Sequence, residues 1–370
     1  KPRVRNYIHE WIFHKMMGEE NLINLKYKFI KLKINGKNLG LYTIEESFDK
    51  QLIERNKRRN GPIFGLDEDL SWARFEKPIF EIYNKKFWEK NENYKLVNIS
   101  SEILNNFFYK KNNLESFDLE KWATFFALTD LLYTYHGAYP KSVKFYFNPV
   151  SNLIEPIPFD GHRLHPNFHV KNPDFDKSIL IDLILDKNKD KYFGWIKPFF
   201  INKDGTSNND FLLLYLKALK KISTENYLNN FFDKYDSKIK SINSLIYKDY
   251  FYYDNLTNFG PGIYYFKKND MYIRAQHIRE KISKNIRVNI SQNTNKVKLK
   301  YDTLVPIKVV STKCENEKKQ KEFFFSKDII LSNLNLNSFI ELQNTLKYQI
   351  VELDDFNKKY IRCKSIKFQN

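Results

Sequence analysis

The sequence predicts an α+β protein that ends in an all-β accessory domain. Up to about residue 290, segments with apolar residues at helical spacing are interspersed with short alternating segments that are typical of strands. From there on only short β-like runs occur, which favours a separate β-sandwich-like domain over 290–370. Because 370 residues are long for one domain, we expect divisions near residues 65 and 290.

The first of these parts, 1–65, is expected to form a small α+β lobe. Apolar residues at helical spacing predict an amphipathic helix over residues 3–17. Alternating apolar and polar residues then predict two strands, 30–34 and 39–44, and the pair Asn35-Gly36 is a typical hairpin turn between them.

The second part, 66–289, is expected to be a larger, mainly helical lobe that contains one hairpin. A helix begins at Asp118, and Asp130 falls on or beside its apolar side, which is an unusual place for an acid. Two strands follow over 143–147 and 153–159, joined by a turn rich in asparagine. We also expect helices over most of 176–250 and one more that ends near Ile286.

The predicted hairpin ends in the stretch EPIPFDGH, in which Asp160 and Gly161 follow an apolar run. A carboxylate at the end of a buried strand is costly unless a positive group meets it. The following glycine allows a sharp turn or a close approach to a ligand. Asp160 therefore either caps a turn or presents its carboxylate to a cation.

The charge of the chain favours an acidic or phosphorylated partner. The formal net charge is +18, which attracts anions over long range without defining a site. The lysines are scattered, so most of them are expected on solvated faces. A polyanion-binding or nucleic-acid-binding protein is one class of function to consider, but we recognise no binding module and expect no specific nucleic acid.

Two classes of protein are disfavoured by composition, and the start of the chain predicts a fragment. The two cysteines, Cys314 and Cys363, are too few for a disulfide framework, although they allow one late bridge. No apolar stretch approaches the roughly 20 residues of a transmembrane helix. The chain opens on Lys1, directly before a helix, and we expect it to be a fragment or mature region that lacks its N-terminus.

Two blocks of the sequence resemble the CotH kinase family. The first comprises VRNYIHEWIFHKMMG and the later FIKLKINGKNLGLYTIEESFDKQLIERN, with an Asn-Gly turn, a Gly-Leu-Tyr strand and a glutamate that follows it. The second comprises LTDLLYTYHG and KFYFNPVSNLIEPIPFDGH, in which a strand ends in an aspartate. The blocks have the family's order and spacing and cover about residues 1–165, and the sequence up to 290 is compatible with the rest.

The resemblance implies a divergent, two-lobed protein-kinase-like fold that uses ATP with Mg²⁺ or Mn²⁺. The implied activity is phosphoryl transfer to a serine or threonine of a protein substrate. The basic surface would favour an acidic substrate. Asp160 would hold the metal on the nucleotide phosphates, as the aspartate of the kinase D-F-G motif does.

The catalytic loop that the resemblance implies departs from the family. Ser142 stands where the family has a metal-binding asparagine, and His136 or Gly137 stands where an acid is expected. His136 can act as a base near neutral pH, and Asp130 is the nearest acid upstream. These differences leave open a catalytically degenerate, pseudokinase-like scaffold of a cell surface or coat.

Further residues are candidates for contact with the nucleotide. Glu45 and Glu46 are expected to open a helix, and the resemblance implies that one of them anchors a phosphate-contacting lysine, either Lys31 or Lys33. Arg163 is expected to contact phosphate.

Neighbouring histidines suggest a second kind of site, which we weigh less. His162, His165 and His169 lie close together, but Pro166 interrupts them and no cysteine assists, so a structural zinc site is disfavoured.

Analogy with the family suggests a surface, secreted or spore-coat location. The sequence indicates no oligomeric state.

Overall fold

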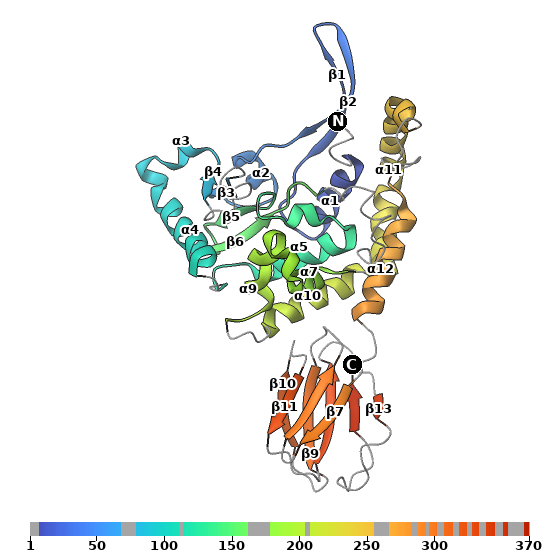
Figure 1. Ribbon diagram of the computed structural model, residues 1–370. Coiled ribbons are helices and arrows are strands. Elements are labelled where there is room, and N and C mark those ends of the chain that lie inside the picture. Colours follow the sequence, from blue (N-terminus) through green and yellow to red (C-terminus); the bar gives the residue numbers. More distant parts are fainter. Residues whose placement is uncertain are drawn as a thin grey trace.

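The computed structural model describes residues 7–67, 79–110, 114–161, 178–203, 208–254 and 266–282, and the backbone of the strands between residues 288 and 369. These residues form helices and several small sheets, which confirms the α+β class at this coarse level (Figure 1). Among the described helices, none is long and apolar enough to cross a membrane, in agreement with the sequence.

The first elements are a helix and the predicted hairpin. Helix α1 spans Tyr7–Glu19, and strands β1 (Tyr27–Ile34) and β2 (Lys37–Glu45) pair antiparallel. Asn35 and Gly36 have φ angles of 47° and 78°, the left-handed conformations that an Asn-Gly hairpin turn requires. In Figure 1 the outer end of this hairpin extends away from the helices.

The next helix begins later than the sequence predicts. Strand β2 continues through Glu45, and α2 spans only Lys50–Arg55. Asp49 caps this helix, because its carboxylate accepts hydrogen bonds from the backbone N–H groups of Gln51 (2.9 Å) and Leu52 (3.1 Å). The expectation that Glu45 and Glu46 open the helix is therefore wrong, since the side chain that satisfies its first N–H groups is Asp49.

A four-stranded antiparallel sheet in the order β4-β3-β5-β6 carries the predicted second hairpin. Its strands are β3 (Ile63–Leu66), β4 (Phe80–Ile82), β5 (Lys144–Asn148) and β6 (Leu153–Ile157). Strand β3 spans the expected boundary at residue 65 and pairs with β5, so this sheet joins the two predicted lobes. Asp160 follows the end of β6.

Helices surround this sheet and the buried helix α5 (Leu119–Leu132). Trp122 of α5 is fully buried and donates a hydrogen bond from Nε1 to the carbonyl of Ile154 in β6 (2.9 Å), which ties α5 to the sheet. The sequence predicts a helix that begins at Asp118, and Asp118 is the residue that caps α5. The remaining helices are α3 (Lys85–Trp88), α4 (Asn91–Lys110), α5 (Leu119–Leu132), η2 (Tyr135–Ala138), α7 (Leu180–Leu185), η4 (Lys187–Lys189), α8 (Asp190–Phe193), η5 (Gly194–Ile196), α9 (Lys197–Phe200), α10 (Asn209–Ile222), α11 (Glu225–Asp254) and α12 (Lys268–Ile282).

The C-terminal part contains strands, as the short β-like runs predict. They form a five-stranded sheet in the order β10-β9-β12-β14-β13 and a three-stranded sheet in the order β11-β8-β7. That they constitute an accessory domain stays a prediction. The strands are β7 (Val288–Asn293), β8 (Lys296–Tyr301), β9 (Ile307–Lys313), β10 (Lys318–Phe323), β11 (Asp328–Ser332), β12 (Ser338–Asn344), β13 (Val351–Leu353) and β14 (Ile366–Gln369).

Candidate functional site

The candidate site is centred on the turn that follows β6. Asp160 is 9% exposed and has a φ angle of 55°, in the left-handed region, which costs most residues energy and which aspartate tolerates better than most. The glycine beside it has another purpose. A β-carbon added to Gly161 would lie 2.2 Å from Cδ1 of Phe13 in α1, so this position needs glycine for space, while the aspartate itself makes the turn.

A second loop, far away in the sequence, packs against this turn. A β-carbon added to Gly137 would lie 3.1 Å from the carbonyl oxygen of Phe159 and 3.4 Å from the Cα atom of Gly161. A larger residue at Gly137 would therefore require the neighbouring backbone to shift by a few tenths of an ångström. The structure therefore brings the loop that carries His136 and Ser142 against the loop that carries Asp160.

His136 and Ser142 also contact each other within their loop. Nδ1 of His136 lies 3.4 Å from Oγ of Ser142. His136 is half-buried and stacks at an angle on Tyr139, with ring centroids 5.1 Å apart, whereas Ser142 is fully buried. Of these two residues, His136 is the one with a solvent-accessible surface.

A buried lysine that the sequence reasoning missed lies in the same region. Lys144, at the start of β5, is 5% exposed, and its Nζ donates a hydrogen bond to the carbonyl of Lys141 (2.6 Å) and lies 5.4 Å from the ring centroid of Phe159. A β-carbon on Gly65 would lie 3.2 Å from both Lys144 and Tyr83. The signal in the sequence was a single lysine within the otherwise apolar run VKFYF.

Electrostatics connect Tyr83 with Asp160. Burial, followed by the charges of Glu81 and Asp160, raises the pKa of Tyr83 to about 12. The phenol is protonated at neutral pH, as an ordinary tyrosine is, and burial and the two carboxylates hold its proton more tightly. Lys144, Tyr83 and Asp160 thus supply a cation, a hydroxyl donor and a carboxylate around the end of the central sheet, a set of groups suited to a phosphorylated ligand and its metal.

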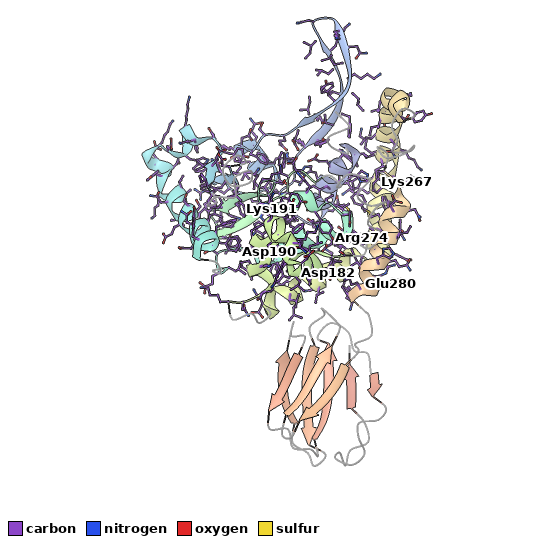
Figure 2. The ribbon with its side chains drawn as sticks, in the orientation of Figure 1. Asp182, Asp190, Lys191, Lys267, Arg274 and Glu280 are labelled. Atoms are coloured by element: carbon purple, nitrogen blue, oxygen red, sulfur yellow. The ribbon has the colours of Figure 1, made fainter. Side chains whose placement is uncertain are left out.

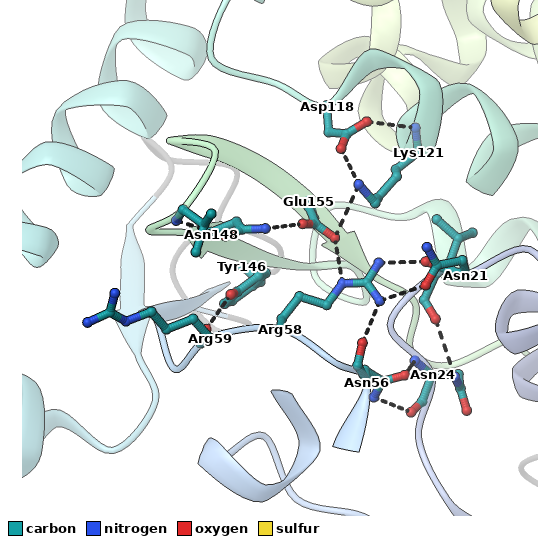
Figure 3. A network of polar contacts seen from close by, with 12 residues as sticks. Asn21, Asn24, Asn56, Arg58, Arg59, Asp118, Lys121, Tyr146, Asn148 and Glu155 are labelled. Atoms are coloured by element: carbon teal, nitrogen blue, oxygen red, sulfur yellow. Dashed lines mark hydrogen bonds and ion pairs between the residues drawn. The ribbon is translucent and has the colours of Figure 1, made fainter. Parts of the chain in front are cut away.

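A polar network holds the last strand of this sheet in place (Figure 3). Glu155 of β6 is 1% exposed and accepts hydrogen bonds from Nδ2 of Asn148 (2.7 Å) and Nε of Arg58 (3.1 Å). The ammonium of Lys121 lies 3.7 Å from the same carboxylate. Because two cations face this buried charge, Glu155 has a structural explanation and is not a site candidate.

Asp130, the other predicted catalytic acid, lies inside the protein. It is fully buried, and its Oδ1 accepts hydrogen bonds from the hydroxyl of Tyr135 (2.7 Å) and the backbone N–H of Leu180 (2.7 Å). Its Oδ2 accepts from the hydroxyl of Tyr215. Arg274 of α12, labelled in Figure 2, has Nη2 4.0 Å from Oδ1 and donates from Nε to the Asp130 carbonyl (2.8 Å).

This environment favours a structural role for Asp130. Its partners come from η2, α7, α10 and α12, so the carboxylate joins four elements to α5. Burial raises the pKa of Asp130 to about 6, and Arg274 and the tyrosines oppose that rise. Among the described residues, the arginine beside Asp130 is Arg274. Arg163 and the nearby His162, His165 and His169 lie outside the described residues.

The residues expected to contact the nucleotide in the first lobe are not brought together. Glu46 accepts hydrogen bonds from Nε of Arg55 (3.0 Å) and the backbone N–H of Lys26 (2.8 Å). Lys31 and Lys33 are exposed on the hairpin, opposite Leu41 and Asn38 respectively, toward its outer end. Arg55 therefore takes the place that we expected a hairpin lysine to fill.

Glu45 lies at the opposite end of the hairpin from those lysines. It is paired in register with Tyr27 and sits beside Glu10 and His14 of α1. The sequence does not predict this grouping. Polar residues occur on several sides of α1, so nothing in the pattern distinguishes Glu10 and His14 from the others. Burial, and then the charges of Arg55 and Lys15, lower the pKa of His14 to about 3, so its ring is neutral at physiological pH.

Comparison with known proteins adds no family to this geometry. Neither the models of known protein families nor the curated proteins contain a match to this chain.

Proposed function

We propose that the chain is a CotH-like atypical protein kinase that transfers phosphate from ATP to a serine or threonine of a protein substrate, with Mg²⁺ or Mn²⁺. The observation that supports this proposal is the packing of Gly137 against the Asp160 turn. The loop that carries His136 and Ser142, which contact each other, therefore lies against the turn that carries Asp160. The proposed fold is a divergent two-lobed kinase-like fold followed by an accessory β domain. We expect an acidic protein substrate and, by family analogy, a surface or secreted location.

The residues around Asp160 suit a metal that is bound together with its nucleotide. Mg²⁺ in such sites is commonly held by one or two carboxylates, and phosphate oxygens and water complete its shell. Asp160 offers one carboxylate, and Ser142 a hydroxyl if its loop opens. The metal would neutralise the charge of the phosphates during transfer. Lys144 is the nearby ammonium that is suited to a phosphate oxygen.

His136 is the candidate for the acceptor side of the reaction. It is half-buried, whereas Asp130 is enclosed by its partners. In the proposed step the hydroxyl oxygen of the substrate forms a bond to the γ-phosphorus, the bond to the β-phosphate oxygen breaks, and ADP leaves. His136 would position the hydroxyl and accept its proton.

Thermal unfolding with and without ATP plus Mg²⁺ or Mn²⁺ tests the nucleotide site. A ligand at about 100 times its dissociation constant stabilises the native state by about 2.7 kcal/mol, which raises the Tm by several degrees. We expect a metal-dependent rise in the wild type and none in Asp160→Asn. Asp233→Asn is the matched control, because Asp233 is exposed on α11, and it should retain the full rise.

Either outcome of the unfolding experiment decides whether Asp160 is part of a nucleotide site. No rise in the wild type, or an equal rise in Asp160→Asn, would contradict the proposal. A rise that is lost in Asp160→Asn alone justifies an assay of radiolabelled phosphate transfer to an acidic protein such as casein.

A second candidate function is nucleotide binding without transfer. It is favoured by Ser142, which is fully buried against His136 and replaces the metal-binding asparagine of the family. A pseudokinase-like scaffold of this kind would show the metal-dependent rise in Tm but no transfer of label from ATP. The active kinase and the pseudokinase-like scaffold are thus expected to give the same result in thermal unfolding and different results in the phosphate-transfer assay.

A further inference from the structure

A mixed cluster of one histidine and two glutamates lies between α1 and the end of β2. Glu10 and His14 are four residues apart and therefore share one face of α1, and Glu45 is the last residue of β2. One ligand atom from each side chain lies within 4.8 Å of those of the other two. Glu10 is fully buried and His14 is 2% exposed.

The ring of His14 supplies a second observation that points to a ligand. Its Nδ1 accepts a hydrogen bond from the backbone N–H of Leu25 (3.3 Å), whereas its Nε2 is buried without a hydrogen-bond partner. A buried polar atom of this kind normally has a partner, because its desolvation is otherwise uncompensated. Nε2 is therefore the ring nitrogen without a hydrogen-bond partner, and it can bind an ion beside the two carboxylates once its proton moves to Nδ1.

We propose that Glu10, His14 and Glu45 bind one transition-metal ion, Zn²⁺ in the first instance. One imidazole nitrogen and two carboxylate oxygens are a ligand set that Zn²⁺ and Mn²⁺ accept, whereas Mg²⁺ prefers oxygen ligands alone. Bonds of about 2.1 Å in a tetrahedral shell separate ligand atoms by about 3.4 Å. The side chains therefore need to close by little more than 1 Å from the 4.8 Å limit.

The expected role of this metal is structural. Glu10 and His14 are almost completely buried, which favours a structural ion over one that binds a substrate. The ion would fasten the end of β2 to α1. Phe13, the neighbour of His14 on α1, packs against Gly161, so the same helix supports the Asp160 turn. The metal site does not depend on the proposed kinase function.

Metal binding changes the position of one proton. While Nδ1 accepts from Leu25, the neutral ring carries its proton on Nε2. A metal on Nε2 requires the proton on Nδ1, and the hydrogen bond from Leu25 is given up. The nitrogen chemical shifts of the His14 ring should therefore report an exchange of tautomers when Zn²⁺ is added.

Titration with Co²⁺ tests the site directly in the full chain. After EDTA treatment and removal of the chelator, we expect one equivalent of Co²⁺ to give the visible absorption of a nitrogen-containing site, and one equivalent of Zn²⁺ to abolish it. Excess Mg²⁺ should have no effect. Glu45→Gln should weaken Co²⁺ binding by at least about 10-fold, since losing even a hydrogen-bond partner of a metal ligand typically costs about that much.

Two controls separate this proposal from its alternatives. Glu54→Gln makes the same change at a side chain that is 54% exposed and should bind Co²⁺ like the wild type. Asp160→Asn should also bind like the wild type, which distinguishes this site from the nucleotide site. The proposal fails if the folded wild type gives no Co²⁺ spectrum, whatever the variants do, or if a folded Glu45→Gln binds as tightly as the wild type.

Discussion

Asp130 and Asp160 are two acids that are both nearly excluded from solvent, yet their surroundings differ completely. Asp130 lies within a regular helix, and donors from three other elements occupy both of its carboxylate oxygens, with Arg274 of a fourth element nearby. Asp160 lies in a left-handed turn between loops that meet from distant parts of the sequence. Hydrogen-bond donors from several elements give Asp130 a structural role that is sufficient to explain its burial. A costly backbone conformation such as that of Asp160 is more common at functional sites.

The largest effect in this comparison is expected at Asp130. Asp130→Ala removes the acceptor of two tyrosine hydroxyls and one backbone N–H and leaves Arg274 without its carboxylate. Breaking a buried ion pair of this kind costs about 3–5 kcal/mol of the free energy of unfolding. Urea unfolding at pH 7 measures the loss.

Asp118→Ala is the matched control on the same helix. Asp118 accepts from the backbone N–H of Lys121 (3.1 Å) as the cap of α5, and its loss should cost about 1 kcal/mol. If Asp130→Ala and Asp118→Ala lower the free energy of unfolding equally, Asp130 contributes no more to stability than a helix cap does.

The sequence predicts what depends on neighbouring residues. The Asn35-Gly36 turn and the hairpin that leads to Asp160 have local signals, because turn conformation and strand alternation are properties of a few adjacent residues. The buried side of α5, including Asp130, follows from helical spacing. The sequence places the start of α2 too early, since two glutamates at the end of a strand resemble the first turn of a helix, whereas the residue that caps α2 is Asp49.

The sequence does not predict which distant residues meet. Arg274 donates to Asp130 across 144 positions, and no local pattern connects them. The same is true of Glu45, which was expected to pair with a lysine of its own hairpin and instead lies beside Glu10 and His14. The long-range packing of helices and loops determines which residues become partners. The members of a buried cluster of charged side chains therefore follow only from the three-dimensional structure.

A smaller effect should appear in the pH dependence of stability. The pKa of Asp130 is raised from 3.8 to about 6, chiefly by burial. The folded protein therefore holds this proton more tightly than the unfolded chain, so the contribution is fully present below about pH 4 and is lost as pH rises through about 6. The stability advantage of the wild type over Asp130→Ala should shrink by roughly 1–3 kcal/mol between pH 4.5 and 7.5.

Denaturant unfolding of both proteins at the two pH values measures this change, because effects of other titrating groups cancel in the difference. An advantage that grows as pH rises would mean that Arg274 and the tyrosines outweigh burial and hold the pKa of Asp130 below its ordinary value.

The smallest effect concerns the backbone at Asp160. Because asparagine adopts the left-handed conformation more readily than alanine, Asp160→Asn should be more stable than Asp160→Ala by about 1 kcal/mol. The same pair of substitutions at Asp233, on the exposed face of helix α11, should show the opposite order, since alanine is the better helix former. Urea unfolding of the four variants measures both differences. If the order at Asp160 is the same as at Asp233, the left-handed turn is not a constraint in solution, and the strongest backbone argument for a functional Asp160 is lost.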